Sequence, residues 1–250
     1  MNRILLEEEE IGQDGVAELD GRRAAHIEGV LGCHTGDTVR VGRIGGPRGT
    51  ARVESVGGGR ARLRCTLDMP PLPPSGISLL LALPRPKVMH RLWAPLASLG
   101  VANIVLTNAA KVERQYFDTH WLDPAVYRTL LIEGLEQSGD TGLPTVRVCR
   151  RFKPFIEDES PAFFGTARRI ACHPGGAPPL GTRLPPGGTA LALAIGPEGG
   201  WSDYEIDLMR QYGFECASFG ERTLRTDIAV TAILGAALSA RAAADHAEGL

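Results

Sequence analysis

The sequence predicts an α/β protein in which a small, mostly β module precedes a larger domain built on a mainly parallel sheet. Residues 37–67 contain three short strand patterns separated by glycine-rich turns. From residue 77 onward, apolar strand patterns alternate with helical ones, which is typical of a parallel sheet. The connecting segment MPPLPPSG holds four prolines, which favour an extended spacer. We therefore expect a first domain at 1–70, a linker at 70–76 and a second domain at 77–250.

The first domain is expected to contain one short helix and three strands. Asp20 is a residue type that favours the N-cap, and the apolar spacing after it predicts a helix over 22–30. The side chains expected to be buried there are Ala25, Ile27, Val30 and Leu31. Strand patterns follow at 37–44, 50–56 and 60–67, and short strands with tight turns favour a small barrel.

The last of these strand patterns is strongly basic. Its arginines alternate with Ala61, Leu63 and Cys65, so the guanidinium groups are expected to share one face of a half-buried strand. Between residues 40 and 64 the chain has seven arginines and one acid, Glu54. Such an excess predicts a phosphate-binding stripe, although a solvated strand face explains the charge equally well. The candidate RNA-binding residues are Arg40, Arg60, Arg62 and Arg64.

The second domain is predicted by its alternating patterns. Residues 77–83 form a continuous apolar run, typical of a strand that is buried on both faces of a sheet. Further strands are expected at 101–107, 145–149, 168–173, 189–195 and 214–219. Helices are expected at 86–99, 121–137, 202–212 and 226–244. The proline- and glycine-rich segment 173–188 is a loop by composition.

Composition argues against several classes of protein. No uninterrupted apolar run approaches the roughly 20 residues of a membrane span, and four glutamates interrupt the N-terminus, unlike a signal peptide. We therefore expect a cytoplasmic protein with no membrane partner. The cysteines are dispersed and odd in number, which argues against a disulfide framework and a structural zinc site. Cys172 and His173 are adjacent but do not make a tetrahedral site, so no metal is expected.

A strand, a glycine-rich turn and a helix follow one another over residues 189–212. The turn is Gly196-Pro197-Glu198-Gly199-Gly200, and Ser202 with Glu205 has the spacing of a capping box. Glycines let the backbone approach a ligand closely, so this arrangement favours a binding edge. The turn matches neither the dinucleotide fingerprint nor a phosphate loop, and a purely structural turn explains it as well.

A second unusual segment, FGERTLRTD, lies between the last predicted strand and the last predicted helix. Arg222 and Arg225 are three residues apart beside a helix N-terminus, where they can hold an anion or polarise a carbonyl. Capping and surface ion pairs explain both residues equally well when the segment is taken alone.

The two segments together are far more specific. Two segments resemble the C-terminal signature motifs of the RsmE family in their order, spacing and residue identities: IGPEGGWSDYE and, after it, FGERTLRTDIA. LPRPKVMHRLWAPLASLGV resembles the first helix of that family's catalytic domain, and IEGLEQSGDTGLPTV resembles its glutamine-bearing helix and the next strand. The first domain resembles the PUA-like RNA-binding domain of the same family.

This resemblance implies a SPOUT-type methyltransferase domain with a C-terminal trefoil knot, a rare exception to the rule that chains do not thread loops. It also implies a homodimer in which each subunit binds S-adenosyl-L-methionine (SAM) in its knot. By position, the residues implied to contact SAM are Ile195, Gly196, Pro197, Glu198, Gly199, Phe219, Gly220, Leu224, Arg225 and Thr226. Cys172, His173 and Pro174 match the strand-end loop that supplies a third wall.

The implied reaction is methyl transfer to N3 of a uridine in 16S ribosomal RNA. Arg225 and Arg222 are the candidates for orienting the uracil and stabilising negative charge on its carbonyl oxygens. Glu198 or Asp227 is expected to accept the N3 proton, although holding the turn and capping the last helix explain these two acids as well. Two alternatives remain: a SPOUT methyltransferase of another RNA target (a tRNA base or a ribose 2′-O), or a non-catalytic RNA-binding assembly factor.

Some positions depart from the usual pattern of the family. They are Ser98, the run Asn108-Ala109-Ala110, the pair Asp140-Thr141 and the pair Asp227-Ile228. The segments implied to bind SAM match well, so the departures bear on the target nucleotide and on the scaffold.

Overall fold

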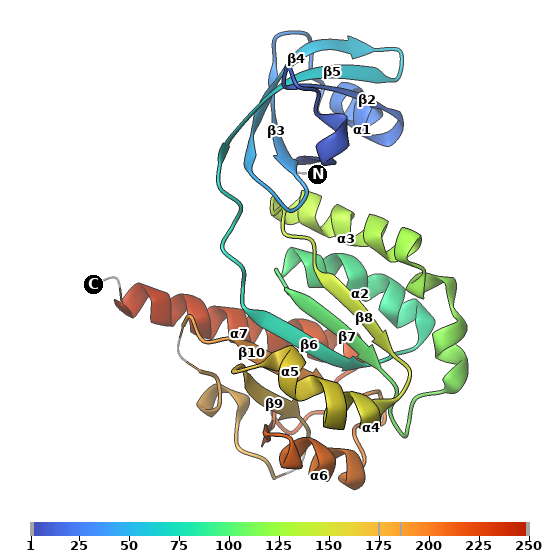
Figure 1. Ribbon diagram of the computed structural model, residues 1–250, viewed down its shortest axis with the longest axis vertical. Helices are drawn as coiled ribbons and strands as arrows, with labels where there is room; N and C mark the ends of the chain where they lie inside the picture. The colour runs from blue at the N-terminus through green and yellow to red at the C-terminus, as the bar shows by residue number, and fades with distance from the viewer. Residues whose placement is uncertain (1–2, 175, 186, 249–250) are drawn as a thin grey trace. The chain divides into compact units, whose positions relative to one another are not determined.

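The computed structural model describes residues 3–174, 176–185 and 187–248 (Figure 1). Its contacts divide the chain into a first unit, Met1–Pro73 with Ile132–Leu143, and a second unit, Pro74–Leu131 with Pro144–Leu250. The division after Pro73 falls within the proline-rich segment. Residues 132–143, which were expected in the second domain, pack with the first unit.

The first unit is built on a five-stranded sheet of order β1-β3-β4-β5-β2. β1 pairs with β3 in parallel, and the other neighbouring strands are antiparallel. The bounds are β1 (Ile4–Leu6), β2 (Val16–Asp20), β3 (Thr38–Arg43), β4 (Arg48–Gly57) and β5 (Arg60–Met69). β3, β4 and β5 were predicted, whereas the short β1 and the acid-containing β2 were not. No ladder joins β1 to β2 among the described residues, so the sheet is open there instead of closing as the predicted barrel.

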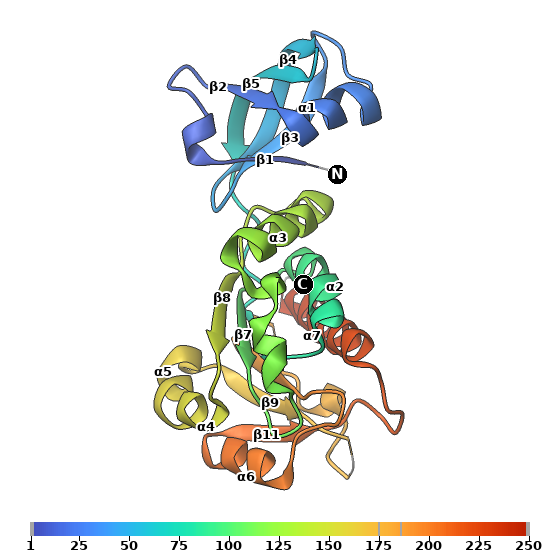
Figure 2. The same ribbon diagram turned by 90° about the vertical axis from the view of Figure 1, so that its right-hand side faces the viewer.

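One hydrophobic core holds this sheet together. All five strands and the helix contribute to it, with Ile4 and Leu6 from β1, Ala17 and Leu19 from β2, and Leu63 from β5 all buried. Because the two edge strands reach the same core, the sheet must curl around it, as Figure 2 shows. Removing these apolar side chains from water is the main favourable contribution to folding of the unit.

The helix of the first unit differs from its prediction. α1 (Gly21–Ala25) continues into a wider π-type turn, His26–Val30. Ile27 is buried as predicted, together with Ala24, whereas Ala25 is exposed and Val30 and Leu31 are 72% and 44% exposed, so the prediction was wrong at these three positions. Because a π-type turn holds more residues than an α-helical turn, it changes the angle between successive side chains around the helix axis. The prediction assumed the α-helical angle. Asp20 stands at the N-cap position, as predicted, although its side chain makes no cap hydrogen bond.

Residues 132–143 join the first unit through buried hydrogen bonds. The hydroxyl of Thr141 donates to the carbonyl of Gly46 at 2.7 Å, and the Gly45 N–H donates to the Thr141 carbonyl at 2.7 Å. The Arg3 guanidinium donates to the carbonyls of Gly139 (3.0 Å) and Val41 (2.6 Å). Thr141, a position that departs from the family pattern, is therefore explained by this packing.

The second unit is an α/β domain around a six-stranded sheet of order β11-β9-β10-β6-β7-β8. All of its neighbouring strands pair in parallel, which confirms the predicted parallel sheet. The strands are β6 (Ile77–Ala82), β7 (Asn103–Thr107), β8 (Thr145–Cys149), β9 (Arg168–Cys172), β10 (Leu191–Ile195) and β11 (Phe214–Ala217). β10 is buried along its whole length, as expected for a central strand with both faces covered.

Helices cover both faces of this sheet. α2 and α7 lie on one face and α4 and α5 on the other (Figures 1 and 2). The bounds are α2 (Pro86–Ser98), α3 (Pro124–Ser138), α4 (Phe152–Pro154), α5 (Ser160–Phe164), α6 (Asp203–Gln211) and α7 (Thr226–Glu248). α2, α3, α6 and α7 were predicted, whereas the helical stretch over 152–164 was not, because prolines interrupt its apolar period.

α7 is unusually apolar. The window Thr226–Ala243 has a mean hydropathy of 1.3, and 28% of it is buried. By length and composition alone it is apolar enough to cross a membrane, a test that helices of soluble proteins also pass. Within the second unit this helix packs against α2 and β10.

We predict that Thr141→Val lowers the free energy of unfolding of the first unit by about 1–3 kcal/mol, because the buried Gly46 carbonyl loses its donor. Denaturant unfolding followed by circular dichroism would measure this. Thr66→Val, at an exposed position of β5, serves as the control and should have little effect. Equal stability of Thr141→Val and wild type would show that the hydroxyl does not hold the segment.

Candidate functional site

A cavity lies at the carboxyl ends of β9 and β10, the edge at which parallel sheets usually bind ligands. Three segments far apart in the sequence form its walls, and α7 closes it. The lining residues are Cys172, His173, Pro174, Ile195, Gly196, Pro197, Glu198, Gly200, Phe219, Gly220, Arg222, Thr223, Leu224, Thr226, Ala229 and Ile233.

The first wall is the turn between β10 and α6. Ser202 and Glu205 form the predicted capping box, in which the Glu205 carboxylate accepts from the Ser202 N–H at 2.8 Å. The other carboxylate oxygen accepts from the Ala110 N–H at 2.7 Å, and Glu205 is only 3% exposed. The Lys111 ammonium donates to the Gly199 carbonyl at 2.6 Å. The segment after β7 therefore fixes the turn from outside the cavity.

The backbone geometry explains why two positions of this turn are occupied by glycine. A Cβ atom at Gly196 would lie 3.1 Å from the Trp201 backbone nitrogen and 3.2 Å from its ring. Gly200 has a φ of +70°, a conformation that other residues rarely adopt. Gly199 is less constrained, because its added Cβ would meet only the flexible Lys111 side chain.

The second wall is the segment between β11 and α7. Gly220 has a φ of +101°, which lets the chain turn sharply beside the cavity. Just before it, Ser218 pairs with the 178–180 segment: its N–H donates to the Pro178 carbonyl, and the Leu180 N–H donates to the Ser218 carbonyl. The 178–180 segment, part of the predicted 173–188 loop, thus supports the wall.

The third wall follows β9. Burial raises the pKa of the Cys172 thiol to about 12, so this thiol is neutral at physiological pH. Burial also lowers the pKa of His173, with Lys111 and Arg210 adding to the effect and Asp203 opposing it. The Nδ1 atom of His173 is buried and has no hydrogen-bond partner among the described residues. A buried polar atom without a partner at a cavity wall is suited to a ligand hydrogen bond.

The structure brings most of the predicted cofactor residues together. Those lining the cavity are His173, Ile195, Gly196, Pro197, Glu198, Phe219, Gly220, Leu224 and Thr226. Gly199 and Arg225 do not line it, whereas Arg222 does. Ala229 and Ile233 were missed, although their spacing of four residues on a predicted helix that begins at Thr226 could have indicated them.

Arg225 instead forms an ion pair beside the cavity. Its guanidinium lies 2.9 Å from the Asp227 carboxylate, and Arg91 of α2 lies 3.0 Å from the same oxygen. The other Asp227 oxygen accepts from the Ile228 N–H. Partial burial alone would raise the pKa of the Asp227 carboxyl, but Arg225, the backbone bond and Arg91 together lower it. Asp227 is therefore a weak base held between two arginines.

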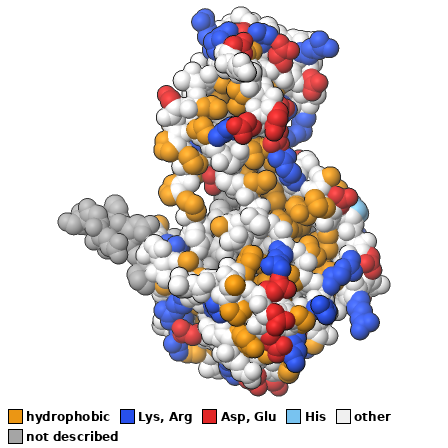
Figure 3. Space-filling model, in the orientation of Figure 1, with side chains coloured by type: hydrophobic (Ala, Val, Ile, Leu, Met, Phe, Trp, Pro, Cys, Tyr) orange, Lys and Arg blue, Asp and Glu red, His pale blue; other side chains and the backbone are white. Residues whose placement is uncertain are grey.

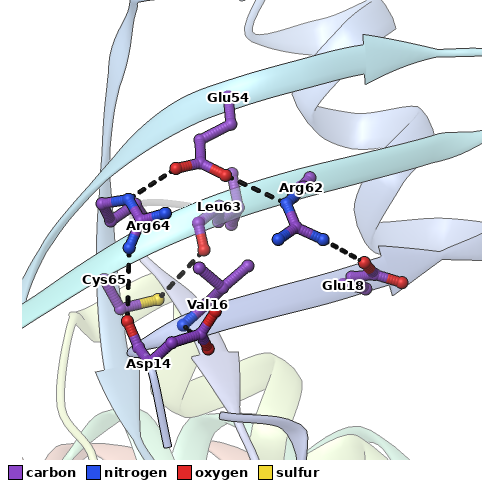
Figure 4. Close-up of polar contacts among 8 residues, drawn as sticks. All are labelled: Asp14, Val16, Glu18, Glu54, Arg62, Leu63, Arg64 and Cys65. Carbon is purple, nitrogen blue, oxygen red and sulfur yellow. Dashed lines mark hydrogen bonds and ion pairs between the residues drawn. The ribbon is translucent and has the colours of Figure 1, made fainter. Parts of the chain in front are cut away.

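The arginine-rich strand of the first unit is largely neutralised. Arg62 pairs with Glu18 of β2 and with Glu54 of β4, and Arg64 pairs with the other oxygen of Glu54 (Figure 4). These hydrogen bonds hold the pKa of the Glu54 carboxyl below its usual range. Figure 3 shows basic and acidic side chains intermingled on this unit. The predicted stripe of free guanidinium groups is therefore broken at Arg62 and Arg64.

The cavity suits an organic ligand, and its charged lining consists of one acid, Glu198, and one base, Arg222. Its walls combine glycine backbone, apolar side chains and the unpartnered His173 nitrogen. Over the described parts of the chain, no group of three His, Cys, Asp or Glu side chains could hold a metal ion.

The fold and this cavity define a cofactor-binding α/β domain of the RNA methyltransferase class, and residues 71–238 match the RNA methyltransferase domain family. The chain is 31% identical over 245 residues to ribosomal RNA small subunit methyltransferase E of Treponema pallidum, covering 96% of this chain and 91% of that protein. It therefore belongs to the ribosomal RNA small subunit methyltransferase E family.

Solved structures share the fold. The enzyme of the same name from Neisseria gonorrhoeae, bound to S-adenosyl methionine, has a TM-score of 0.75 at 23% identity and covers 96% of this chain and 97% of its own. A probable rRNA-methyltransferase from Porphyromonas gingivalis has a TM-score of 0.77 at 21% identity and covers 96% and 99%.

We predict that Cys172 is the slowest cysteine to react with iodoacetamide at pH 8. Only about 10⁻⁴ of a thiol with a pKa near 12 is ionised there, and the thiolate is the reactive form. Peptide mass spectrometry after a short exposure would measure this, with the less buried Cys149 as the internal comparison. Labelling of Cys172 as fast as Cys149 would contradict a neutral, buried thiol.

Proposed function

We propose that the protein transfers a methyl group from SAM to N3 of a uridine in 16S ribosomal RNA. The observation that carries this proposal is the convergence of both signature segments and the 172–174 loop on one cavity, in a chain of this family. The relative from T. pallidum is named for the small-subunit ribosomal RNA, and the structure from N. gonorrhoeae holds SAM.

The residues of the cavity fit SAM, which supplies an electrophilic methyl group when bound. Ile195, Pro197 and Leu224 offer apolar surface for the adenosyl group. The unpartnered Nδ1 of His173 would offer a hydrogen bond, and the lowered pKa of this imidazole favours its neutral form, which would not repel a cationic ligand. The glycines at 196, 200 and 220 let the backbone approach the ligand.

Arg222 is the side chain we assign to the uracil. It lines the cavity, whereas Arg225 does not line it and is paired with Asp227. A guanidinium can donate two hydrogen bonds to a carbonyl oxygen whose negative charge grows as the N3 proton leaves. Arg225 is then a positioning residue, which keeps the second wall in place through Asp227 and Arg91.

Glu198 is the proton acceptor that the geometry favours over Asp227. The Glu198 side chain is exposed, lines the cavity and makes no hydrogen bond or ion pair within the described chain. It is therefore free to meet a substrate. Asp227 is already engaged by two guanidinium groups that lower its pKa, which makes it a poorer general base.

The neutral Cys172 supports methylation at nitrogen over methylation at a ring carbon. Attack by a thiolate on the base is one way to activate a pyrimidine carbon, and it requires an ionised cysteine at the site. Cys172 is the cysteine in the cavity wall, and its pKa of about 12 keeps it protonated. Transfer to nitrogen needs only orientation and removal of a proton.

We further infer a SPOUT-type trefoil knot in the second unit. β11 lies at the edge of the sheet beside β9, yet the following α7 packs on β10 and on α2. The chain thus returns from the edge to the middle of the sheet after pairing with the 178–180 segment at Ser218. This path is what a threaded C-terminus requires.

A homodimer and an RNA-binding first unit complete the proposal. The low burial of the apolar α7, with Ile228 51% exposed, supports a partner subunit that covers this helix. The first unit, which we infer to be PUA-like, would contact RNA phosphates through its arginines, among which the sequence singled out Arg40, Arg60, Arg62 and Arg64. A soluble protein of the cytoplasm, where ribosomes are assembled, fits this role.

Nucleoside mass spectrometry of ribosomal RNA and of transfer RNA from a deletion strain tests the function directly. We expect 3-methyluridine to be lost from 16S ribosomal RNA and restored when the gene is returned. Loss of a methylated tRNA base or of a ribose 2′-O-methyl group instead would identify another RNA target. Unchanged ribosomal RNA and transfer RNA would favour a non-catalytic assembly factor.

We predict that Arg222→Ala lowers single-turnover methylation by roughly 10²–10³, the range for losing one donor to a developing oxyanion. Arg222→Lys should also be impaired, because it keeps the charge but loses the planar fork. SAM affinity, measured by calorimetry, should change much less. Glu221→Gln, at the exposed neighbouring position, is the control. A loss that appears entirely as weaker SAM binding would remove Arg222 from the chemical step.

A further inference from the structure

The outward face of β3 and β4 carries a cluster of arginines and threonines. The strand register places Arg40 opposite Thr50, and Arg52 opposite Thr38. On the next strand Thr66 continues the row of Thr50. Arg48 alternates with Thr50 and Arg52 on β4, so it shares their face. Guanidinium and hydroxyl groups together are the side chains that most often contact nucleic-acid phosphates.

These arginines differ from those of β5 in their partners. Arg62 and Arg64 are compensated by Glu18 and Glu54 (Figure 4). Arg40, Arg48 and Arg52 form no ion pair within the described residues. The Arg48 guanidinium instead donates to the neutral Pro70 carbonyl at 2.9 Å. The positive charge of the β3–β4 face is therefore available to a ligand.

Arg3 gives independent evidence that this charge is uncompensated. Burial lowers its pKa, and the positive charges of Arg48 and Arg40 lower it further, while Asp140 only partly opposes them. Three guanidinium groups thus repel one another in the unbound protein. An anion bound by the exposed Arg40 and the half-buried Arg48 would relieve this repulsion, whereas the buried Arg3 donates to backbone carbonyls.

We propose that the RNA backbone binds the first unit on the β3–β4 face, with Arg40, Arg48 and Arg52 contacting phosphates and Thr38, Thr50 and Thr66 donating hydrogen bonds. The proposal rests on RNA being the substrate, as the proposed function states. Of the RNA-binding residues predicted from the sequence, Arg40 belongs to this surface. Arg62 and Arg64 do not, because Glu18 and Glu54 neutralise their charge. Arg60 also lacks an ion pair but lies at the far end of β5, opposite Asp20.

The test measures how binding of unmodified 16S ribosomal RNA transcript to the full chain depends on salt. Each phosphate contact contributes roughly 0.7–0.9 to the slope of log K against log salt. The Arg40→Gln/Arg48→Gln/Arg52→Gln variant should therefore lose about 2–3 units of slope. Its SAM affinity should stay at the wild-type value, because these residues do not line the cavity.

The comparison variant is Glu54→Gln/Arg64→Gln, which removes the ion pairs of Glu54 on β4 with Arg62 and Arg64 on β5 without changing the net charge. Its slope should match that of wild type. An unchanged slope in the triple variant, or an equal loss in the comparison variant, overturns the proposal. A wild-type protein that binds the transcript with a salt-dependent affinity but never methylates it overturns the proposed function and leaves the binding surface standing.

Discussion

The buried carboxylate of Glu205 is the contact on which the cofactor cavity depends. One oxygen accepts from the Ala110 N–H, and the other accepts from the backbone and the hydroxyl of Ser202. The same side chain therefore starts α6, ends the glycine-rich turn and ties the segment after β7 to it. Because Glu205 is almost fully buried, water cannot replace these bonds if they are lost.

Once that turn is fixed, the parallel sheet brings the other walls of the cavity next to it. The carboxyl ends of β9 and β10 lie side by side, so the 172–174 loop and the turn face each other. The segment after β11 closes the space between them, and the start of α7 supplies Ala229 and Ile233. Outside the cavity, Asp227 joins Arg225 to Arg91 and so couples this last wall to α2. Residues that touch the ligand and residues that position them are thus distinct sets.

Sequence patterns predicted the features that depend on residues close together in the chain. The apolar runs predicted the parallel sheet, and the Ser202–Glu205 spacing predicted the capping box. Contacts between distant residues were not predictable in this way. Glu18 lies on β2, 44 residues before Arg62. A count of charges between residues 40 and 64 therefore includes Glu54 but misses Glu18. The docking of Thr141 on Gly46 spans 95 residues, and the π-type turn at His26 altered a helical period that looked regular.

Calorimetric titration of SAM into Glu205→Gln tests the central claim most directly. The amide can satisfy fewer of the three donors, and losing one charge-assisted hydrogen bond costs about 1.5–3 kcal/mol, or roughly 10-fold to 100-fold in affinity. We expect that loss with circular dichroism unchanged, while Asp207→Ala, on the exposed face of the same helix, binds SAM normally. Wild-type affinity in a folded Glu205→Gln protein would contradict a cofactor cavity held by this carboxylate.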